Sequence, residues 1–274
     1  MSGGPYGGGA VRFAPDSALV DEVAVSPNIG PRRDGATPRL LVLHYTGLES
    51  AARSIAVLCD PVCQVSCHYL VGLDGRIWQM VAEADRAWHA GQSYWRGERD
   101  INSWSIGIEI QNQGHMAGLP VYPNEQMAAV IDLAKDILAR HDMQRDDVVA
   151  HSDIAPQRKI DPGEAFDWCR LSEAGIGHWA APAPVAGSTW EADRLRRALG
   201  ENGHEPALRR CLTGLAAYGY EISPAAEFDI YTVRVIKAFQ RHYRPALVNG
   251  LPDRSTLETL ERLLDTMPSG RLST

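Results

Sequence analysis

The sequence lacks the features that would assign the protein to a membrane or to a nucleic acid. No apolar run approaches the roughly 20 residues that a membrane-spanning helix needs. No block of lysines or arginines stands out, and the formal net charge is -7, so the positive surface expected of a nucleic-acid-binding protein is missing. We therefore expect no membrane span and no nucleic-acid partner.

Signals for export and for a disulfide framework are also missing. The first residues, MSGGPYGGGAVRFAPDSALV, contain no charged segment followed by an apolar core and no lipobox cysteine. Five cysteines are an odd number for paired disulfides, which favours a reducing compartment. These features predict a cytoplasmic protein, with the periplasm as the alternative if an export signal has been removed.

Several common catalytic and binding signatures are absent. There is no G-x-S-x-G motif, and neither GLDG nor the glycine-rich start is followed by the lysine and helix of a phosphate loop. Cys59, Cys63 and Cys67 precede His68 and suggest a Cys₃His metal site. Their spacing differs from the usual two-residue knuckle, and Pro61 interrupts any helix that would align them. Buried structural thiols are the favoured interpretation.

Length and local composition predict two domains. The chain has 274 residues, against roughly 150 for a typical domain. Residues 1–26 begin with five glycines among the first ten and are predicted to form a flexible arm. Residues 27–177 are predicted to form the first domain and residues 191–274 the second. The segment 178–190, rich in alanine, proline and glycine, is the expected linker.

The first domain shows strands interleaved with helices. Strands are predicted at Arg39–Thr46 and Trp104–Asn112, the second with clean alternation of apolar residues, and a third is predicted within residues 147–154. Asp74-Gly75 predicts the turn of a hairpin, and residues 124–141 predict an amphipathic helix. The expected fold is α/β, with a mixed central β-sheet flanked by helices.

The second domain contains three stretches with helical spacing of apolar residues. They lie around residues 207–218, 230–243 and 255–264. About 80 residues of short helices suffice for a small, marginally stable domain. We expect a three-helix domain.

His44, His151 and Asp161 are candidate metal ligands. Imidazole and carboxylate suit Zn²⁺, and a catalytic zinc site uses three protein ligands and keeps a fourth position open for water. His44 lies late in one predicted strand, His151 ends another, and Asp161 lies in the loop that follows, so the three can meet at one edge of the sheet. The alternative is a pair of hydrogen-bonded histidines and an aspartate that caps a turn. The expected cofactor is one Zn²⁺ per chain.

Glu109 and Lys159 are candidate catalytic residues. Glu109 lies within a predicted strand and shares its face with small residues, a suitable place for a general base that accepts a proton from the attacking water. An exposed glutamate on an edge strand is the alternative. Lys159, two residues before Asp161, is predicted to stabilise an oxyanion, unless it is only solvated surface. Arg158 is expected to face solvent.

Five segments of the first domain occur in a characteristic order: LLVLHYT, VSCHYLVGLDGRIWQMV, RAWHAG, NSWSIGIEIQN and AHSDIAPQRKIDPGEAFDW. In this order, between about residues 28 and 168, they resemble the zinc-dependent type 2 N-acetylmuramoyl-L-alanine amidases. The resemblance implies that His44, His151 and Asp161 bind zinc. It also implies that Glu109 is the acid/base residue and that Lys159 assists the oxyanion.

The same resemblance implies hydrolysis of the amide between N-acetylmuramic acid, or its 1,6-anhydro form, and L-alanine of peptidoglycan or muropeptides. Trp88, His89, Asn102 and Trp104 are then expected to contact the substrate or to support the site, with packing as the alternative. A non-catalytic peptidoglycan recognition protein is the alternative function. A structural zinc protein would instead need four protein ligands and would unfold on chelation.

The second domain resembles a three-helix peptidoglycan-binding domain. The segments that carry this resemblance are YGYEI, EFDIYTVRVIKAFQRHYRP and VNGLPDRSTLETL, with Glu227 in place of the usual glycine. The implied partner is peptidoglycan or a muropeptide. An intact sacculus and a soluble or 1,6-anhydro muropeptide both fit these features, and the oligomeric state stays open.

Overall fold

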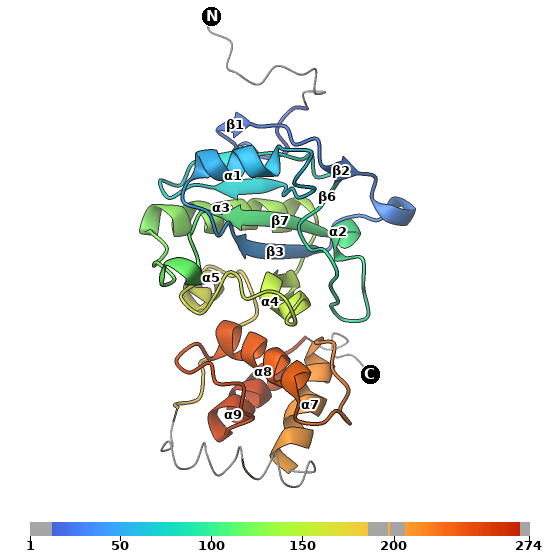
Figure 1. The fold of residues 1–274 in the computed structure, drawn as a ribbon, viewed down its shortest axis with the longest axis vertical. Coiled ribbons are helices and arrows are strands. Elements are labelled where there is room, and N and C mark those ends of the chain that lie inside the picture. Colours follow the sequence, from blue (N-terminus) through green and yellow to red (C-terminus); the bar gives the residue numbers. More distant parts are fainter. Residues whose placement is uncertain (1–12, 186–196, 198–205, 269–274) are drawn as a thin grey trace, which may run out of the picture.

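The computed structural model of the protein describes residues 13–185, 197 and 206–268. A body built around a β-sheet stacks on a smaller body of helices (Figure 1). The strands are β1 (Glu22–Val23), β2 (Ile29–Gly30), β3 (Leu40–Tyr45), β4 (Tyr69–Val71), β5 (Ile77–Gln79), β6 (Arg86–Ala87), β7 (Ser105–Ile110) and β8 (Val148–Ala150). The α-helices are α1 (Ala51–Leu58), α2 (Ile101–Trp104), α3 (Asn124–Arg140), α4 (His151–Ile154), α5 (Trp168–Glu173), α7 (Pro206–Tyr218), α8 (Ile230–Tyr243) and α9 (Arg254–Asp265).

Six strands form the central sheet in the order β1-β5-β4-β7-β3-β8. Strands β4, β7, β3 and β8 run parallel, whereas β4 and β5 form an antiparallel hairpin. Gly75 has a φ of 82° in the turn of that hairpin, a conformation that glycine adopts at no steric cost. The expected mixed sheet and the expected hairpin are confirmed.

Both faces of the sheet are covered, which explains the continuous apolar run of β3. Leu41 and Leu43 pack with the isoleucines of β7 and with α3 on one face. Leu40 and Val42 lie on the opposite face, in a cluster that continues into the helical domain. Because side chains alternate along a strand, His44 shares the face of Val42.

Residues 13–26 belong to the first domain, which corrects the expected flexible arm of residues 1–26. Strand β1 pairs with β5, and the N–H groups of Ala24 and Ser26 donate to the carbonyls of Gln79 and Met80 at 2.9 Å. Without this segment, the side of β5 that faces away from β4 would be an unpaired edge of the sheet. Residues 1–12 lie outside the described part of the chain.

The expected linker is held against the helical domain over its first part. The imidazole of His178 lies 2.8 Å from the Tyr218 hydroxyl and 3.0 Å from the Thr266 hydroxyl. Ala183 exchanges hydrogen bonds with Thr259 and Ser255. The chain is therefore held against the helical domain at His178 and Ala183, and residues 186–190 lie outside the described residues.

Three helices of the second domain, α7, α8 and α9, confirm the three predicted helical stretches.

Two strand boundaries in the first domain differ from expectation. Trp104 ends helix α2 instead of starting the strand, and β8 ends at Ala150, so that His151 begins helix α4. Among the described residues, none of the helices combines the length and the apolar character that crossing a bilayer requires.

Candidate metal centre

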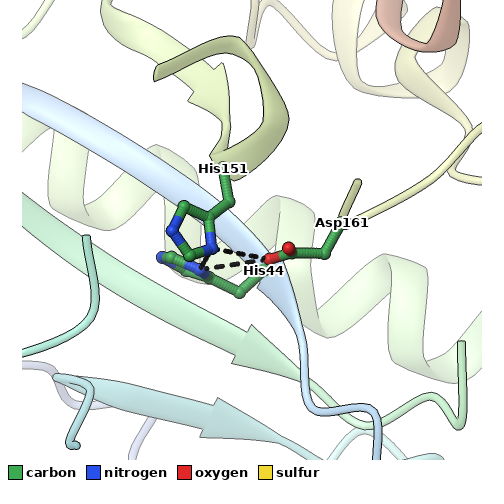
Figure 2. Close-up of side chains that lie close together, drawn as sticks. All are labelled: His44, His151 and Asp161. Atoms are coloured by element: carbon green, nitrogen blue, oxygen red, sulfur yellow. Dashed lines mark hydrogen bonds and ion pairs between the residues drawn. The ribbon is translucent and has the colours of Figure 1, made fainter. Parts of the chain in front are cut away.

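His44, His151 and Asp161 meet at one edge of the sheet, as Figure 2 shows. His44 comes from β3, His151 from the first residue of α4, and Asp161 from the loop that follows α4. The Nδ1 atoms of the two histidines are 2.8 Å apart, and Asp161 Oδ2 lies 2.9 Å from His151 Nδ1 and 3.3 Å from His44 Nδ1. All three side chains are buried.

The remaining nitrogen of each histidine has its own partner. His44 Nε2 lies 3.0 Å from His89 Nδ1, and His151 Nε2 lies 3.4 Å from the Ala90 carbonyl. A carbonyl only accepts, so His151 carries its proton on Nε2. The lone pair on Nδ1 of His151 therefore points into the space between His44, His151 and Asp161.

A chain of hydrogen bonds fixes the protonation of His44 in the same way. The Ser105 hydroxyl donates to the Ile101 carbonyl at 2.6 Å, so its oxygen accepts from His89 Nε2 at 3.1 Å. His89 Nδ1 then accepts from His44 Nε2, which leaves the lone pair of His44 Nδ1 facing the centre. Such second-shell partners orient metal-bound histidines in known sites.

This donor set fits a zinc ion. Two imidazole lone pairs at 2.8 Å repel each other unless a proton or a cation lies between them. Ligands at tetrahedral zinc, with bonds of about 2.0–2.1 Å, lie about 3.3 Å apart, close to the three distances observed. Among the described residues, this is the one group of three or more histidine, cysteine or acidic side chains with ligand atoms this close together.

The pKa values of His44 and Asp161 agree with this arrangement. Burial, with a smaller contribution from His151, lowers the pKa of His44 to about 4, which keeps the imidazole neutral. Burial alone would raise the pKa of Asp161, but the two histidines outweigh that effect and lower it. Neutral imidazoles and an ionised carboxylate are the forms that bind metals.

Glu109 lies directly beside the group. It is in register with His44 on the neighbouring parallel strand, about 4.8 Å away in the hydrogen-bonding direction. Its Oε2 atom is buried and has no hydrogen-bond partner among the described residues. Burial raises the pKa of Glu109 well above its usual value, Asp161 raises it further, and Lys159 lowers it.

Lys159 and Arg158 occupy different surroundings in the loop before Asp161. The positive charge of Lys159 is close enough to lower the pKa values of both Glu109 and His44. Arg158 is exposed, as expected, but its guanidinium also donates to the carbonyls of Ala90 and Gln92. The structure thus places Lys159 near the group and uses Arg158 to hold the segment behind it.

The structure gives different roles to the residues that were predicted to contact the substrate. Asn102 is buried, and its Oδ1 accepts from the N–H groups of His89 and Ala90 at 3.0 and 2.7 Å. His89 and Asn102 therefore support the ligands from behind instead of lining a rim.

Trp104 is stacked under Arg39, with the guanidinium carbon 4.0 Å from the centre of the ring. It precedes β7, about 17 Å along the extended chain from Glu109, which corrects its assignment to the site. Substrate contact by the half-buried Trp88 stays a prediction.

The alternative cysteine site does not form. Cys63 is exposed, Cys59 is half-buried, and the buried Cys67 thiol lies 3.7 Å from the Met80 sulfur. His68 accepts from the Gly107 N–H at 3.0 Å instead. The favoured interpretation as buried thiols is right for Cys67 and wrong for Cys63.

Sequence reasoning overlooked Asp153, which governs the local geometry of His151. Its Oδ2 accepts from the Ala150 N–H at 2.8 Å and caps helix α4. The available signal was an acidic residue at the third position of a helix that directly follows a strand. Asp161 is fixed to the same helix, because its carbonyl accepts from the Ser152 N–H at 3.0 Å.

Two histidines and an aspartate brought together beside a further carboxylate, at the edge of a mixed α/β sheet, form an arrangement typical of metal-dependent hydrolases. The sequence profile of the N-acetylmuramoyl-L-alanine amidases matches residues 34–164, and that of a peptidoglycan binding domain matches residues 210–260. The N-acetylmuramoyl-L-alanine amidase AmiD of Escherichia coli is 41% identical over 268 residues, which cover 92% of each chain. The chain belongs to the N-acetylmuramoyl-L-alanine amidase family.

Solved structures agree with this assignment. AmiD of E. coli, in complex with anhydro-N-acetylmuramic acid-L-Ala-D-gamma-Glu-L-Lys, has a TM-score of 0.68 and 42% identity over 85% of this chain and 91% of that chain. AMPDH3 of Pseudomonas aeruginosa, in complex with anhydromuramic pentapeptide, has a TM-score of 0.69 and 37% identity over 86% and 94%. The 1,6-anhydro-N-acetylmuramyl-L-alanine amidase AmpD of E. coli is 38% identical over 53% of this chain and 87% of its own length.

Proposed function

We propose that this chain is a zinc amidase that hydrolyses the bond between N-acetylmuramic acid, or its 1,6-anhydro form, and L-alanine in muropeptides. The observation that carries the proposal is the convergence of two histidine lone pairs and one carboxylate beside Glu109. The solved complexes of AmiD and AMPDH3 contain anhydromuramic peptides, which supports this class of substrate. The likeness of the second domain to peptidoglycan binding domains supports a wall-derived partner.

In this proposal, His44, His151 and Asp161 hold one Zn²⁺ per chain. The ion supplies Lewis acidity and, in catalytic sites of this kind, lowers the pKa of water to about 7. Three protein ligands leave room for a reactant, whereas a structural zinc site is closed by four.

Glu109 moves the proton in the proposed reaction. Its unpartnered Oε2 accepts the proton of the attacking water and passes it to the departing amine of L-alanine. A carboxyl whose pKa is raised by burial suits both steps, because it can act as base and then as acid near neutral pH. Lys159 donates to the carbonyl oxygen of the lactyl group as negative charge develops there.

Substitution of Glu109 by glutamine tests the catalytic role. Glu109→Gln keeps the shape of the side chain but removes the proton acceptor, so we expect kcat on a soluble anhydro-muropeptide to fall by about 10²- to 10⁴-fold. Zinc content, measured by elemental analysis, should stay at one ion per chain. Glu49→Gln is the control, since Glu49 is an exposed carboxylate in the loop after β3.

Three outcomes would contradict this assignment in different ways. Full activity of Glu109→Gln would remove Glu109 from the mechanism. A wild-type chain that binds zinc and muropeptide without releasing stem peptide would be a recognition protein. A chain that unfolds when zinc is chelated would point to a structural ion. Comparing rates on insoluble sacculi with those on soluble anhydro-muropeptides would assign the chain to remodelling or to recycling.

We further propose a cytoplasmic location, with the periplasm as the alternative. All five cysteines, each within the described residues, are free thiols, which fits a reducing compartment. Fractionation of cells that carry the full natural gene tests this proposal: recovery of the protein with periplasmic markers would overturn it.

A further inference from the structure

The segment of residues 151–164, here called the metal loop, lies along helix α8 of the helical domain. The Gln157 side chain donates to the Tyr231 carbonyl at 3.1 Å, and Arg234 donates back to the Gln157 carbonyl at 3.1 Å. Figure 1 shows α4, which begins this loop, between the sheet and α8. The helical domain thus contacts the loop that carries two of the three candidate zinc ligands.

Asp153 makes a buried polar contact between the two domains. This fully buried carboxylate accepts from the Tyr220 hydroxyl at 2.6 Å and from His242 Nδ1 at 2.6 Å, both in the helical domain. It also accepts from the Ala150 N–H at 2.8 Å, the bond that caps helix α4 at His151. One carboxylate therefore joins the cap of the ligand-bearing helix to two side chains of the other domain.

The His242 ring is itself held firmly. It stacks between Trp168 of α5 and its neighbour Tyr243, with ring centroids 3.6 and 3.7 Å away. The preceding residue, Arg241, has its guanidinium 3.7 Å from the Glu164 carboxylate at the far end of the metal loop. The last turn of α8 thus contacts both ends of the loop.

The hydrogen bonds of Asp153 connect the helical domain to the position of His151, in addition to holding the two domains together. A buried carboxylate needs its full set of donors, and Asp153 receives only one of three from its own domain. Loss of a donor forces the side chain to turn or the cap to open, and either movement redirects the lone pair of His151. Residues that orient metal ligands in this way affect the metal affinity and the activity of a site.

We propose that Tyr220 and His242 are positioning residues for the metal centre, acting through Asp153 on the direction of His151. The helical domain then contributes to zinc affinity and turnover, in addition to any contact with the wall. This inference rests on the zinc amidase function proposed above.

The variant Tyr220→Phe tests the inference in the full chain, since it removes a single oxygen atom. We expect the zinc dissociation constant, measured by competition with a chromophoric chelator, to rise by about tenfold. With saturating zinc, kcat should fall while KM stays unchanged, because the substrate surface is not altered.

Tyr218→Phe is the matched control. It also removes one buried hydroxyl from the helical domain, but the Tyr218 oxygen bonds to Tyr243 and His178 and does not contact Asp153. Its zinc dissociation constant should stay within about twofold of the wild-type value, a change smaller than the weakest known effect of supporting residues on metal affinity.

His242 provides a second comparison. His242→Asn keeps an N–H donor near the position of Nδ1 and should retain zinc better than His242→Ala. If the alanine variant does not fold, the pair Tyr220→Phe and Tyr218→Phe decides the question.

Two results would overturn the inference alone. One is a Tyr220→Phe protein whose zinc affinity equals that of an active wild-type chain. The other is a Tyr218→Phe protein that loses as much affinity as Tyr220→Phe. A wild-type chain that binds no zinc would instead overturn the proposed function, and this inference with it.

Discussion

Gly107 leaves the space in which a supporting histidine packs. A Cβ atom at this position would come within 2.6 Å of the His89 ring, and that ring is held between His44 and Ser105. The absence of a side chain at Gly107 therefore allows His89 to support a candidate ligand from behind.

Gly107→Ala should displace the His89 ring and weaken the metal centre. We expect a loss of about 1–3 kcal/mol in the free energy of unfolding and about tenfold weaker zinc binding, measured by denaturant titration and chelator competition. Gly30→Ala is the control, since its Cβ would meet only an ordinary contact at 3.7 Å. Unchanged zinc affinity in Gly107→Ala would show that the ring is free to move.

The sequence predicted those site residues whose position depends only on their own strand. The alternation of β7 placed Glu109 opposite the isoleucines that pack on α3, and the end of β3 placed His44. Trp104 was misassigned because a strand pattern does not show where a preceding helix ends. The partners of Asp153 were beyond sequence reasoning, since Tyr220 and His242 are 67 and 89 residues away.

At the level of elements, Glu83 anchors the end of helix α3 to the sheet. Its buried carboxylate pairs with Arg140 and His141 from the end of that helix and accepts from the Tyr69 hydroxyl on β4 at 2.6 Å. Burial alone would raise the pKa of Glu83, but the hydrogen bonds from His141, Arg140 and Tyr69 outweigh burial and lower the pKa to about 2. The folded state therefore favours the ionised form.

The lowered pKa of Glu83 predicts a specific dependence of stability on pH. The stabilisation is complete above the ordinary pKa of a glutamate and is lost as the pH falls toward 2. Glu83→Gln should thus cost about 3 kcal/mol of unfolding free energy at pH 7, and this difference should shrink as urea unfolding is repeated between pH 5 and pH 2.

Glu125→Gln, an exposed substitution at the other end of α3, is the control for Glu83→Gln. Its effect on the free energy of unfolding at pH 7 should be within about 0.5 kcal/mol, as is usual for a substitution on the surface. A difference for Glu83→Gln that stays constant down to pH 2 would mean that the carboxylate is not the origin of the effect.

At the level of the molecule, one apolar cluster runs through both domains. It joins Leu40, Val42 and Trp95 to residues of α7, α8 and α9, and Trp95 meets the Tyr220 ring at 5.1 Å. The Arg96 N–H adds a hydrogen bond across the interface, to the Gly219 carbonyl at 3.0 Å. Domains of one chain commonly share smaller and more polar interfaces, which permit relative motion.

We therefore expect the two domains to unfold together. Differential scanning calorimetry of the zinc-loaded chain should give a single transition, with calorimetric and van't Hoff enthalpies that agree. Two separated transitions, or an early loss of the far-ultraviolet helical signal, would show that the helical domain melts independently of the sheet.

The shared carboxylate Asp153 also limits how such proteins can be recombined. A binding domain joined by a flexible linker can be exchanged for another, because the catalytic domain loses no contacts when it is removed. Here, a chimera that replaced the last third of the chain would leave a buried negative charge without two of its donors. A graft that is to retain the hydrolase must therefore carry equivalents of Tyr220 and His242, whatever wall polymer it is chosen to recognise.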